Sequence, residues 1–439
     1  MTERCGALGV LLCLILLSSS QALSKRRTPI MGWSSWSVYS CNVQEDGIKV
    51  QAQALGDLGL WDLGYTYIDV DDCWMAFNRS AEGLQQANAS TFPSGMAALA
   101  EWLHARGFKL GLYSDAGTTT CQNRAGSYGY EAVDAATYAS WGVDLLKYDT
   151  CNTVPGWDPE EGYPIMGKAL NNTGRDIWYM MCNWGQGDPA TWAGPRALAN
   201  SWRTTNDLMP LFPQFYEVAD ANERWWEYAR PGQFNDPDTL AMGYLFADPP
   251  VTAPATGNTL SYAETRLYFG LWCIMKSNLI LSVDFASSEW PRWILDIVSN
   301  RHAIAINQDA LALQGHRLWS DGEGGNNTDP RAVHVPAGLR EVWSGPLVDG
   351  DVALLLVNRG ESIAIINATF TLHGPHCPKD VNVSVYDVWG QRVFGECASH
   401  FAMRVAPHDG ILLRCSCARP ATRPARKGKD RGDHAFVTQ

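Results

Sequence analysis

The sequence predicts an α/β protein in which a (β/α)8 barrel is followed by a C-terminal antiparallel β-sandwich. From about residue 29 to residue 309, short apolar runs alternate with longer amphipathic segments. Such alternation indicates a parallel sheet, and its length suits eight strand–helix units closed into a barrel. After Gln308 the apolar runs are short and separated by Gly, Pro, Asp and Asn, which is typical of antiparallel strands.

The predicted barrel strands are short apolar runs rich in aromatic and β-branched residues, as expected for strands buried on both faces. They cover residues 65–70, 108–113, 143–148, 177–181 and 279–283. Between them, apolar residues recur at helical spacing. The helices predicted from this spacing cover residues 48–58, 96–106, 131–140 and 264–275.

The predicted sandwich strands cover residues 316–319, 333–335, 352–357, 363–372, 381–389 and 411–414. We therefore divide the chain into a barrel over residues 25–310 and a sandwich over residues 311–417. Residues 418–439 contain six Lys and Arg against two Asp, with few large apolar residues, so this basic tail is expected to be disordered.

The first 24 residues resemble a secretory signal peptide. An apolar run at residues 7–17 follows Arg4, small residues follow the run, and it is too short to span a bilayer. Ten cysteines lie beyond this segment, and Cys415 and Cys417 are expected as structural disulfide halves. Six glycosylation sequons start at Asn78, Asn88, Asn171, Asn326, Asn367 and Asn382. A soluble glycoprotein of the secretory pathway is expected, either secreted or delivered to a lysosome or vacuole.

Charge and composition argue against several classes of partner. Acidic residues number 46 and basic residues 34, for a net charge of −12, so neither a nucleic acid nor an anionic membrane is an expected partner. No His-Glu-x-x-His motif occurs, and neither a metal nor an organic cofactor is implied. A homodimer is one assembly that the sequence leaves open.

Carboxylates at predicted strand ends are the strongest functional signal. In a barrel, catalytic groups lie where strands end at the C-terminal face, so these acids should meet at one mouth. One Asp after a strand can simply cap the next helix, but five such sites together favour a functional cluster. The sites are Asp69 with Asp71 and Asp72, Asp115, Asp149, Asp207, and Asp236 with Asp238.

Tryptophan is abundant, with 19 residues, and several lie near these acids or at other strand ends. Indole rings stack on the apolar faces of sugars while carboxylates bind hydroxyl groups, so the combination predicts a carbohydrate pocket. The alternative is that much of this tryptophan is ordinary core. The tryptophans concerned are Trp33, Trp36, Trp74, Trp184 and Trp202.

Seven motifs occur in an order that resembles glycoside hydrolase family 27, which includes plant and fungal α-galactosidases (melibiases) and α-N-acetylgalactosaminidases. The resemblance spans about residues 28–310. The motifs are Met31-Gly-Trp33-Ser-Ser-Trp36, Asp69-Val-Asp71-Asp72-Cys73-Trp74, Gly111-Leu-Tyr113-Ser-Asp115, Leu146-Lys147-Tyr148-Asp149, Trp202-Arg203, Asn235-Asp236-Pro237-Asp238 and Ile306-Asn307-Gln308-Asp309.

By this resemblance, Asp149 is the nucleophile and Asp207 is the general acid/base of a retaining exo-glycosidase. One carboxylate attacks the anomeric carbon while the other protonates the leaving oxygen and then activates water. Lys147 and Arg203 would favour the ionised nucleophile and bind sugar hydroxyls.

The resemblance also implies a galactose-binding set. Asp71 and Asp72 would bind the outer hydroxyls of galactose, and Trp36, Tyr113 and Asp238 would complete the pocket. The implied disulfides are Cys41–Cys73 and Cys121–Cys151.

Substrate choice depends on Cys182 and Trp184, which by resemblance face the C2 position of the sugar as in plant and fungal α-galactosidases. An indole there excludes an acetamido group. Some members bridge the equivalent of Cys182 to a cysteine just before the Trp-Arg motif, but residues 199–201 are Ala-Asn-Ser, so Cys182 is expected to be a free thiol. Thr239 departs from the Met that is usual in the family.

The resemblance implies hydrolysis of terminal α-galactose from oligosaccharides, galactomannans or glycoconjugates. The alternatives within the family are an α-N-acetylgalactosaminidase and a β-L-arabinopyranosidase, and Asp72 disfavours the latter because that branch carries a longer Glu. A sugar-binding lectin with an inactive barrel is a third reading. It predicts loss of Asp149 or Asp207, and both are present.

Overall fold

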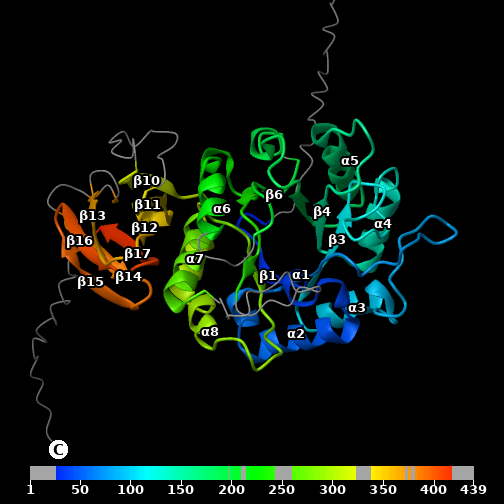
Figure 1. Cartoon of the computed structure of the whole chain (residues 1–439), viewed down its shortest axis with the longest axis horizontal. Coiled ribbons are helices and arrows are strands. Elements are labelled where there is room, and N and C mark those ends of the chain that lie inside the picture. Colours follow the sequence, from blue (N-terminus) through cyan, green and yellow to red (C-terminus); the bar gives the residue numbers. More distant parts are fainter. Residues whose placement is uncertain are drawn as a thin grey trace, which may run out of the picture.

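The computed structural model describes residues 26–196, 198–208, 214–242, 260–322, 338–370, 374, 375, 377 and 381–417. These residues form a parallel barrel and, beside it, an antiparallel β-sandwich (Figure 1). Within these ranges, we find no helix with both the length and the apolar character needed to cross a membrane.

The barrel sheet contains nine described strands in the order β7-β6-β5-β4-β3-β2-β1-β9-β8, and all the pairings are parallel. The strands are β1 Met31–Ser34, β2 Tyr67–Val70, β3 Lys109–Asp115, β4 Leu145–Asp149, β5 Trp178–Cys182, β6 Ser201–Arg203, β7 Phe234–Asp236, β8 Leu240–Ala241 and β9 Leu279–Ser282.

Strands β7 and β8 act as one interrupted strand of the barrel. Strand β7 pairs with β6 and β8 pairs with β9, and only residues 237–239 separate them. The nine strands therefore occupy eight positions, as in a (β/α)8 barrel. The interruption contains Pro237 and Asp238, whose φ is +88°, so the backbone turns at the point where two acids face the mouth.

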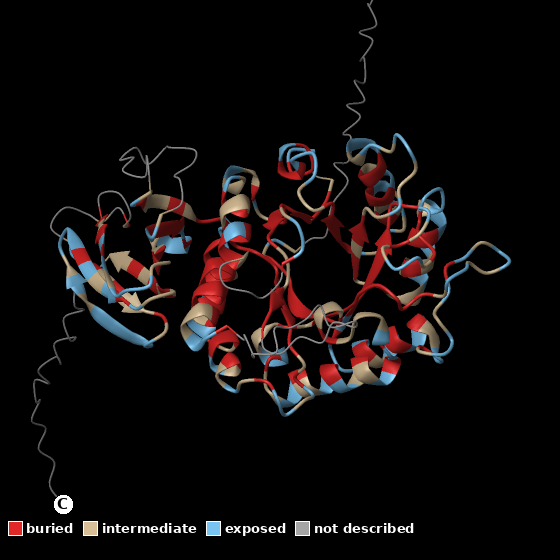
Figure 2. Ribbon diagram, viewed as in Figure 1, coloured by how far each residue is buried: buried red, intermediate tan, exposed pale blue. Residues whose placement is uncertain are grey.

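Helices surround the barrel with their buried faces toward the sheet (Figure 2). Asp158 caps α5 by accepting a hydrogen bond from Glu160 N, and Ser261 and Glu264 form a capping box on α7. The helices are α1 Trp36–Tyr39, α2 Glu45–Asp57, α3 Gly95–His104, α4 Glu131–Trp141, α5 Pro159–Asn172, α6 Gln214–Glu223, α7 Tyr262–Ile274, α8 Trp293–Val298 and α9 Arg301–Asn307. Short 3-10 turns cover Ser40–Asn42, Trp61–Leu63, Pro189–Thr191, Trp226–Tyr228 and Val348–Gly350.

The sandwich packs a six-stranded sheet in the order β10-β11-β12-β17-β14-β15 against the pair β13-β16. A separate core that includes Leu354, Leu356, Ile366 and Phe401 lies between them. The strands are β10 His316–Ser320, β11 Arg340–Pro346, β12 Val352–Asn358, β13 Ala364–Thr369, β14 Val383–Asp387, β15 Arg392–Cys397, β16 His400–Val405 and β17 Asp409–Cys417.

The two parts are joined through α7, which packs against β12 and β17. Leu355 and Leu412 of the sandwich belong to the same continuous core as the barrel helices. Beside it lies a group of four charged side chains that we call the interdomain ion cluster: Asp220 on α6, Arg317, Glu341 and Arg359.

The fold class predicted from the sequence is confirmed. Each predicted barrel strand and helix overlaps an observed element, but the sequence patterns missed the short strands β1, β6, β7 and β8 and the sandwich strands β11, β15 and β16. Residues 1–24, 333–335 and 418–439, and Asn326, lie outside the described residues.

The prediction for the cysteine pair of the last strand was half wrong. Cys417 pairs with Cys377, but Cys415 is a free, buried thiol. The side chain of Cys415 packs in the sandwich core instead, while Cys417 lies with its Cα 5.3 Å from that of Cys377. Position in the sheet, rather than sequence spacing, decides which of the two can reach a partner.

Candidate active site at the barrel mouth

Alternation along the parallel strands brings the site residues together. In a strand, every second side chain points to the same face, so Lys147 and Asp149 lie above Leu145 inside the barrel. Leu145 belongs to an apolar cluster with Tyr67, Trp178 and Phe234 that fills the lower interior. Above this layer, the same strands carry Asp69, Asp149, Cys182 and Asp236, all buried. The barrel interior therefore changes from apolar to acidic toward the C-terminal ends of its strands.

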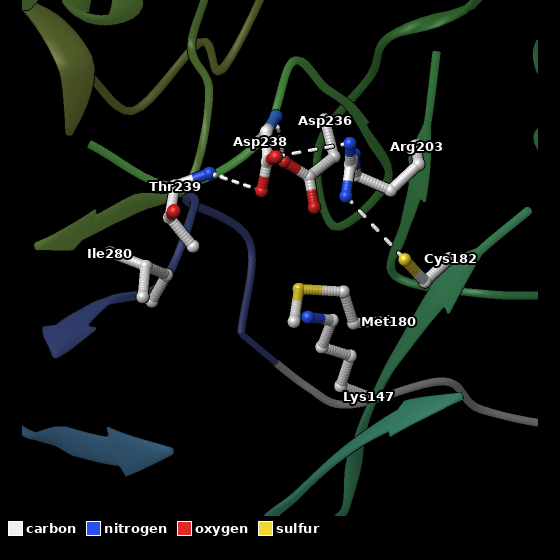
Figure 3. Close-up of a pocket in the computed structure, with 8 residues that line it drawn as sticks. All are labelled: Lys147, Met180, Cys182, Arg203, Asp236, Asp238, Thr239 and Ile280. Carbon is white, nitrogen blue, oxygen red and sulfur yellow. Dashed lines mark hydrogen bonds and ion pairs between the residues drawn. The ribbon is translucent and has the colours of Figure 1, made fainter. Parts of the chain in front are cut away.

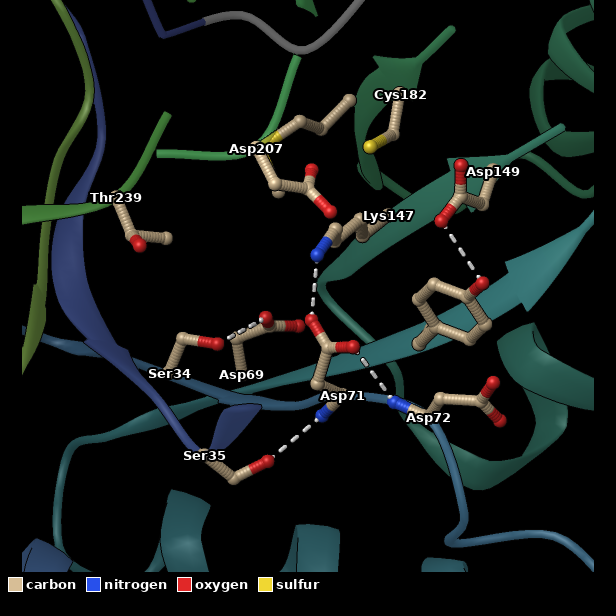
Figure 4. A network of polar contacts seen from close by, with 12 residues as sticks. Ser34, Ser35, Asp69, Asp71, Asp72, Lys147, Asp149, Cys182, Asp207 and Thr239 are labelled. Atoms are coloured by element: carbon tan, nitrogen blue, oxygen red, sulfur yellow. Dashed lines mark hydrogen bonds and ion pairs between the residues drawn. The ribbon is translucent and has the colours of Figure 1, made fainter. Parts of the chain in front are cut away.

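Lys147 is the central cation of the mouth (Figure 4). Its Nζ lies 2.6 Å from Oδ2 of Asp71, and both side chains are largely buried. The backbone N–H of Asp71 donates to Oγ of Ser35 at 2.9 Å, which ties this acid to the end of β1. Burial alone would lower the pKa of Lys147, but Asp71, Asp149 and Asp69 raise it well above its ordinary value, so the ammonium group stays charged.

Asp149 ends β4 and is held from two sides. The hydroxyl of Tyr113 donates to Oδ2 at 2.9 Å, and the N–H of Thr150 donates to Oδ1 at 2.8 Å. Burial raises the pKa of this carboxyl to about 6, the negative charge of Asp207 adds to that rise, and Lys147 opposes it. The result is a fixed carboxylate that ionises under mildly acidic conditions.

Asp207 belongs to the segment after β6, and its side chain is 64% exposed. Figure 4 shows it on the opposite side of Lys147 from Asp149. The guanidinium of Arg203, itself buried, contacts Oδ1 of Asp207 through Nη1 and Oδ2 of Asp238 through Nη2, each at 3.1 Å. One buried acid and one accessible acid therefore approach the mouth from different strands.

Beneath Arg203 lies a small pocket (Figure 3). Its lining brings together four predicted site residues, Lys147, Cys182, Arg203 and Asp238. Nη1 of Arg203 also donates to Sγ of Cys182 at 3.5 Å. The complete lining is Lys147, Met180, Cys182, Arg203, Asp236, Asp238, Thr239 and Ile280.

Asp72 is placed differently from Asp71. It accepts hydrogen bonds from Oγ1 of Thr120 and the N–H of Gln122, both at 3.0 Å, and from the N–H of Cys73 at 2.7 Å. Burial raises the pKa of this carboxyl to about 6, and the Thr120 hydrogen bond opposes the rise. Asp72 thus anchors the loop after β3 beside the mouth, a contact that the sequence did not indicate.

Disulfides join Cys41 to Cys73 and Cys121 to Cys151, the pairs that the family resemblance implies. Cys73 directly follows Asp72 and Cys151 follows Asp149 by two residues, so each bridge fixes a loop that begins at a site residue. Cys182 is a buried free thiol, as expected.

The two tryptophans predicted to bind the substrate, Trp36 and Trp184, each lie two residues beyond the end of a strand, at the same end of the barrel. Trp36 begins α1, directly after the end of β1, and is partly buried. Trp184 is also partly buried, with a φ of +53°, and its Nε1 is buried without a hydrogen-bond partner. Trp184 does not line the small pocket, whereas Met180 and Ile280, which sequence reasoning missed, do. Strand alternation from Cys182 could have indicated Met180.

Asp115, Asp149, Cys121 and Cys151 bring oxygen and sulfur atoms within 4.8 Å of one another. Metal ions bind the thiolate form of cysteine, and both sulfurs here belong to one disulfide. This group therefore does not have the donor atoms of a metal centre.

Comparisons with known proteins agree with this geometry. The family described as Alpha galactosidase A matches residues 28–309, and the Alpha galactosidase C-terminal beta sandwich domain matches residues 337–415. Alpha-galactosidase 2 of Arabidopsis thaliana is 40% identical over 395 residues, which cover 90% of each chain.

Solved structures of similar proteins share the whole architecture. Alpha-galactosidase I from Mortierella vinacea is 31% identical with a TM-score of 0.76, over 88% of this chain and 96% of that one. The alpha-galactosidase of Saccharomyces cerevisiae, solved with raffinose, is 26% identical with a TM-score of 0.73, over 89% of this chain and 98% of that one. With both its barrel and its sandwich matched, the chain belongs to the α-galactosidase family.

Proposed function

We propose that the chain is a retaining exo-α-galactosidase that releases terminal α-D-galactose from oligosaccharides, galactomannans or glycoconjugates. The observation that carries this proposal is the arrangement of Asp149 and Asp207 on opposite sides of Lys147, one buried and hydrogen-bonded and the other accessible.

In the first step, a carboxylate oxygen of Asp149 attacks the anomeric carbon while Asp207 donates its proton to the glycosidic oxygen. The carbon–oxygen bond to the leaving group breaks, and a galactosyl–Asp149 ester forms. Tyr113 and Thr150 hold the carboxylate of Asp149, and Lys147 favours its ionised form. The exposed side chain of Asp207 suits an acid that must meet leaving groups of many shapes.

In the second step, Asp207 takes a proton from water, and the water oxygen attacks the same carbon to release galactose and free Asp149. Two displacements restore the original anomeric configuration. Arg203 contacts both Asp207 and Asp238, so it can keep Asp207 in place as its charge changes.

Recognition of galactose is assigned to Trp36, Asp71, Asp72, Tyr113, Lys147, Arg203 and Asp238. The buried Lys147–Asp71 pair offers a donor and an acceptor to neighbouring hydroxyls. Because an epimer with a misplaced hydroxyl would leave buried polar groups unpaired, such a site can discriminate strongly between sugars. Asp72 contributes through the acceptor capacity that its loop contacts leave unused.

Selectivity at C2 is assigned to Cys182 and Trp184. An indole at this position leaves no room for the acetamido group of N-acetylgalactosamine. Replacement of Trp184 by Ala should therefore admit α-N-acetylgalactosaminides, measured as a rise in their kcat/KM relative to α-galactosides. Unchanged selectivity would contradict the assignment.

A panel of three p-nitrophenyl glycosides tests the function. The α-galactoside should be hydrolysed at acidic pH, and the α-N-acetylgalactosaminide and β-L-arabinopyranoside should be poor substrates. Intact enzyme that releases nothing from the α-galactoside between acidic and neutral pH would contradict the proposal.

For location, we infer the secretory pathway, with residues 1–24 as signal peptide, residues 25–310 as catalytic domain, residues 311–417 as sandwich and residues 418–439 as a tail. The three disulfides support an oxidising compartment. The sequon residues Asn78, Asn367 and Asn382 are exposed, as glycosylation requires. Digestion of the secreted protein with an N-glycosidase should reduce its apparent mass.

A further inference from the structure

Asp69 is a buried carboxyl group that the proposed reaction does not use. It lies on β2 two residues before Asp71, so the two side chains point to the same interior side of the barrel. Oδ2 of Asp69 accepts a hydrogen bond from Oγ of Ser34 at 3.0 Å. Its other oxygen, Oδ1, is buried and has no hydrogen-bond partner. Burying an ionised carboxylate with one oxygen that accepts no hydrogen bond is costly in free energy. The carboxyl group must therefore be protonated or lie near a cation.

Among the described residues, Lys147 is the cation that acts on Asp69. Strand β1 contributes Ser34, which does not titrate, and β3 contributes Gly111, where an added Cβ would lie 3.0 Å from Oδ1. The groups that act on Asp69 by charge are Asp71, which directly follows its strand β2, and Lys147 on β4. Figure 4 shows Asp69 and Asp71 side by side below the end of Lys147. Lys147 is already bound to Asp71 at 2.6 Å.

We propose that Asp69 is a positioning residue: its charge determines whether the ammonium group of Lys147 stays beside Asp71, on the sugar-binding side of the mouth. When Asp69 is protonated it is neutral, and Lys147 interacts with Asp71 and Asp149. Without the proton, Asp69 is a second inner carboxylate that attracts Lys147 away from the sugar. This role rests on the proposed function, because it concerns the same galactose site.

The charges give the direction of the effect. Burial, and then the negative charge of Asp71, raise the pKa of Asp69 to about 7, while Lys147 and the Ser34 hydroxyl oppose the rise. Asp69 therefore holds its proton under acidic conditions and loses it as the pH rises through neutrality. Galactose binding should be tight at acidic pH and weaken above neutral pH, independently of any change in Asp207.

The test measures binding of D-galactose itself between pH 5.5 and 8.5, by titration calorimetry or by competitive inhibition. Galactose is neutral and binding requires no proton transfer, so the protonation of Asp207 as a catalyst does not enter. The intact enzyme should lose affinity by about threefold or more over this range, whereas Asp69→Asn, which keeps the shape and carries no charge, should lose the part of this change that is centred near neutral pH. The pH dependence that remains in the variant belongs to Asp72, Asp149 and Asp115, whose pKa values are also raised into this range. The surface variant Asp62→Asn, which also removes one carboxylate, should behave like the parent enzyme.

A second variant keeps the test informative if Asp69→Asn does not fold. Because the Ser34 hydroxyl stabilises the ionised carboxylate, Ser34→Ala should shift the loss of affinity to higher pH. The proposal is overturned if Asp69→Asn retains the pH dependence of the parent enzyme, or if folded Ser34→Ala leaves its midpoint unchanged. Failure of the proposed function would look different, as absence of galactoside hydrolysis by the parent enzyme at every pH.

Discussion

The protein buries two groups of charged side chains, and their charges are balanced differently. In the interdomain ion cluster, Arg317 and Arg359 each contact both Asp220 and Glu341. Arg359 lies 2.7 Å from Asp220, and each arginine lies 3.0 Å from Glu341. Two cations meet two anions. Although burial opposes it, the hydrogen bond from Arg359 and the charge of Arg317 hold the pKa of Asp220 below its usual value.

At the barrel mouth, carboxyl groups outnumber cations. Lys147 and Arg203 face acids that lie on or just after β2, β3, β4, β6 and β7, and burial together with the charge of Asp149 raises the pKa of Asp115 to about 8. In a neutral cluster, loss of one partner leaves a buried charge uncompensated, whereas a cluster with excess acids retains protons and charge that chemistry can use. The comparison predicts that mutations at the mouth change activity and mutations in the interdomain ion cluster change stability.

The largest effect is expected at the buried acid of the mouth. Replacement of Asp149 by Asn removes the nucleophile and should lower kcat/KM for p-nitrophenyl α-galactoside by at least about a thousandfold. Thermal unfolding should stay close to that of the parent enzyme, since Asn can accept the Tyr113 hydrogen bond. Activity within tenfold of the parent would contradict the assignment.

Replacement of Asp207 by Asn removes the acid/base and should have an effect that depends on the leaving group. Loss of a general acid costs about 10²–10⁴-fold in rate when the leaving group needs a proton. We expect a large loss with a poor leaving group such as a disaccharide and a small loss in the first step with dinitrophenyl galactoside, measured by pre-steady-state kinetics. Equal losses for both substrates would argue against this role.

The interdomain ion cluster should respond in the opposite way. Replacement of Glu341 by Gln removes the fully buried anion of the cluster and leaves the partly buried Asp220, and breaking a buried ion pair costs about 3–5 kcal/mol. The free energy of unfolding from urea denaturation should fall accordingly, while kcat/KM measured well below the unfolding transition stays within about twofold. Glu160→Gln, at the exposed Glu160–Arg196 ion pair, is the matched control and should cost less than about 1 kcal/mol.

The smallest effect, taken per pH unit, concerns the pH dependence of stability. The pKa of Asp115 is raised to about 8, so between about pH 4 and 8 the folded chain keeps a proton that the unfolded chain has released. This contribution to stability is complete at low pH and is lost as the pH rises through that window. The free energy of unfolding should therefore decrease with rising pH less steeply in Asp115→Asn than in the parent enzyme, by up to about 1.4 kcal/mol per pH unit. Parallel stability profiles for variant and parent would contradict it.

The fold could be predicted from the sequence where strands are long and apolar. The runs that became β2 to β5 and β9 are visible because they are buried on both faces. Strands β6 and β7 have three residues each and contain Arg203, Asn235 and Asp236, so tertiary pairing rather than composition makes them strands. The polar residues of these two strands include ones that belong to the site at the barrel mouth.

The residues of the candidate site could be predicted as a set. They meet because the C-terminal ends of the parallel strands lie together at one mouth of the barrel. The sequence could not indicate which acids are free and which are bound. Asp71 pairs with Lys147, whereas the adjacent Asp72 is engaged by the loop at Thr120 and Gln122, a contact across 48 residues of sequence. Asp69 and Asp71 are both buried, but Lys147 pairs with Asp71 while Oδ1 of Asp69 has no hydrogen-bond partner, and no local pattern in the sequence carries that difference.

The central claim is that Asp149 is the residue that forms the covalent bond to galactose. A mechanism-based fluorinated galactoside should inactivate the enzyme by trapping the galactosyl ester, and peptide mapping by mass spectrometry should find the label on Asp149. A label on Asp207, Asp115 or any other residue would contradict the account.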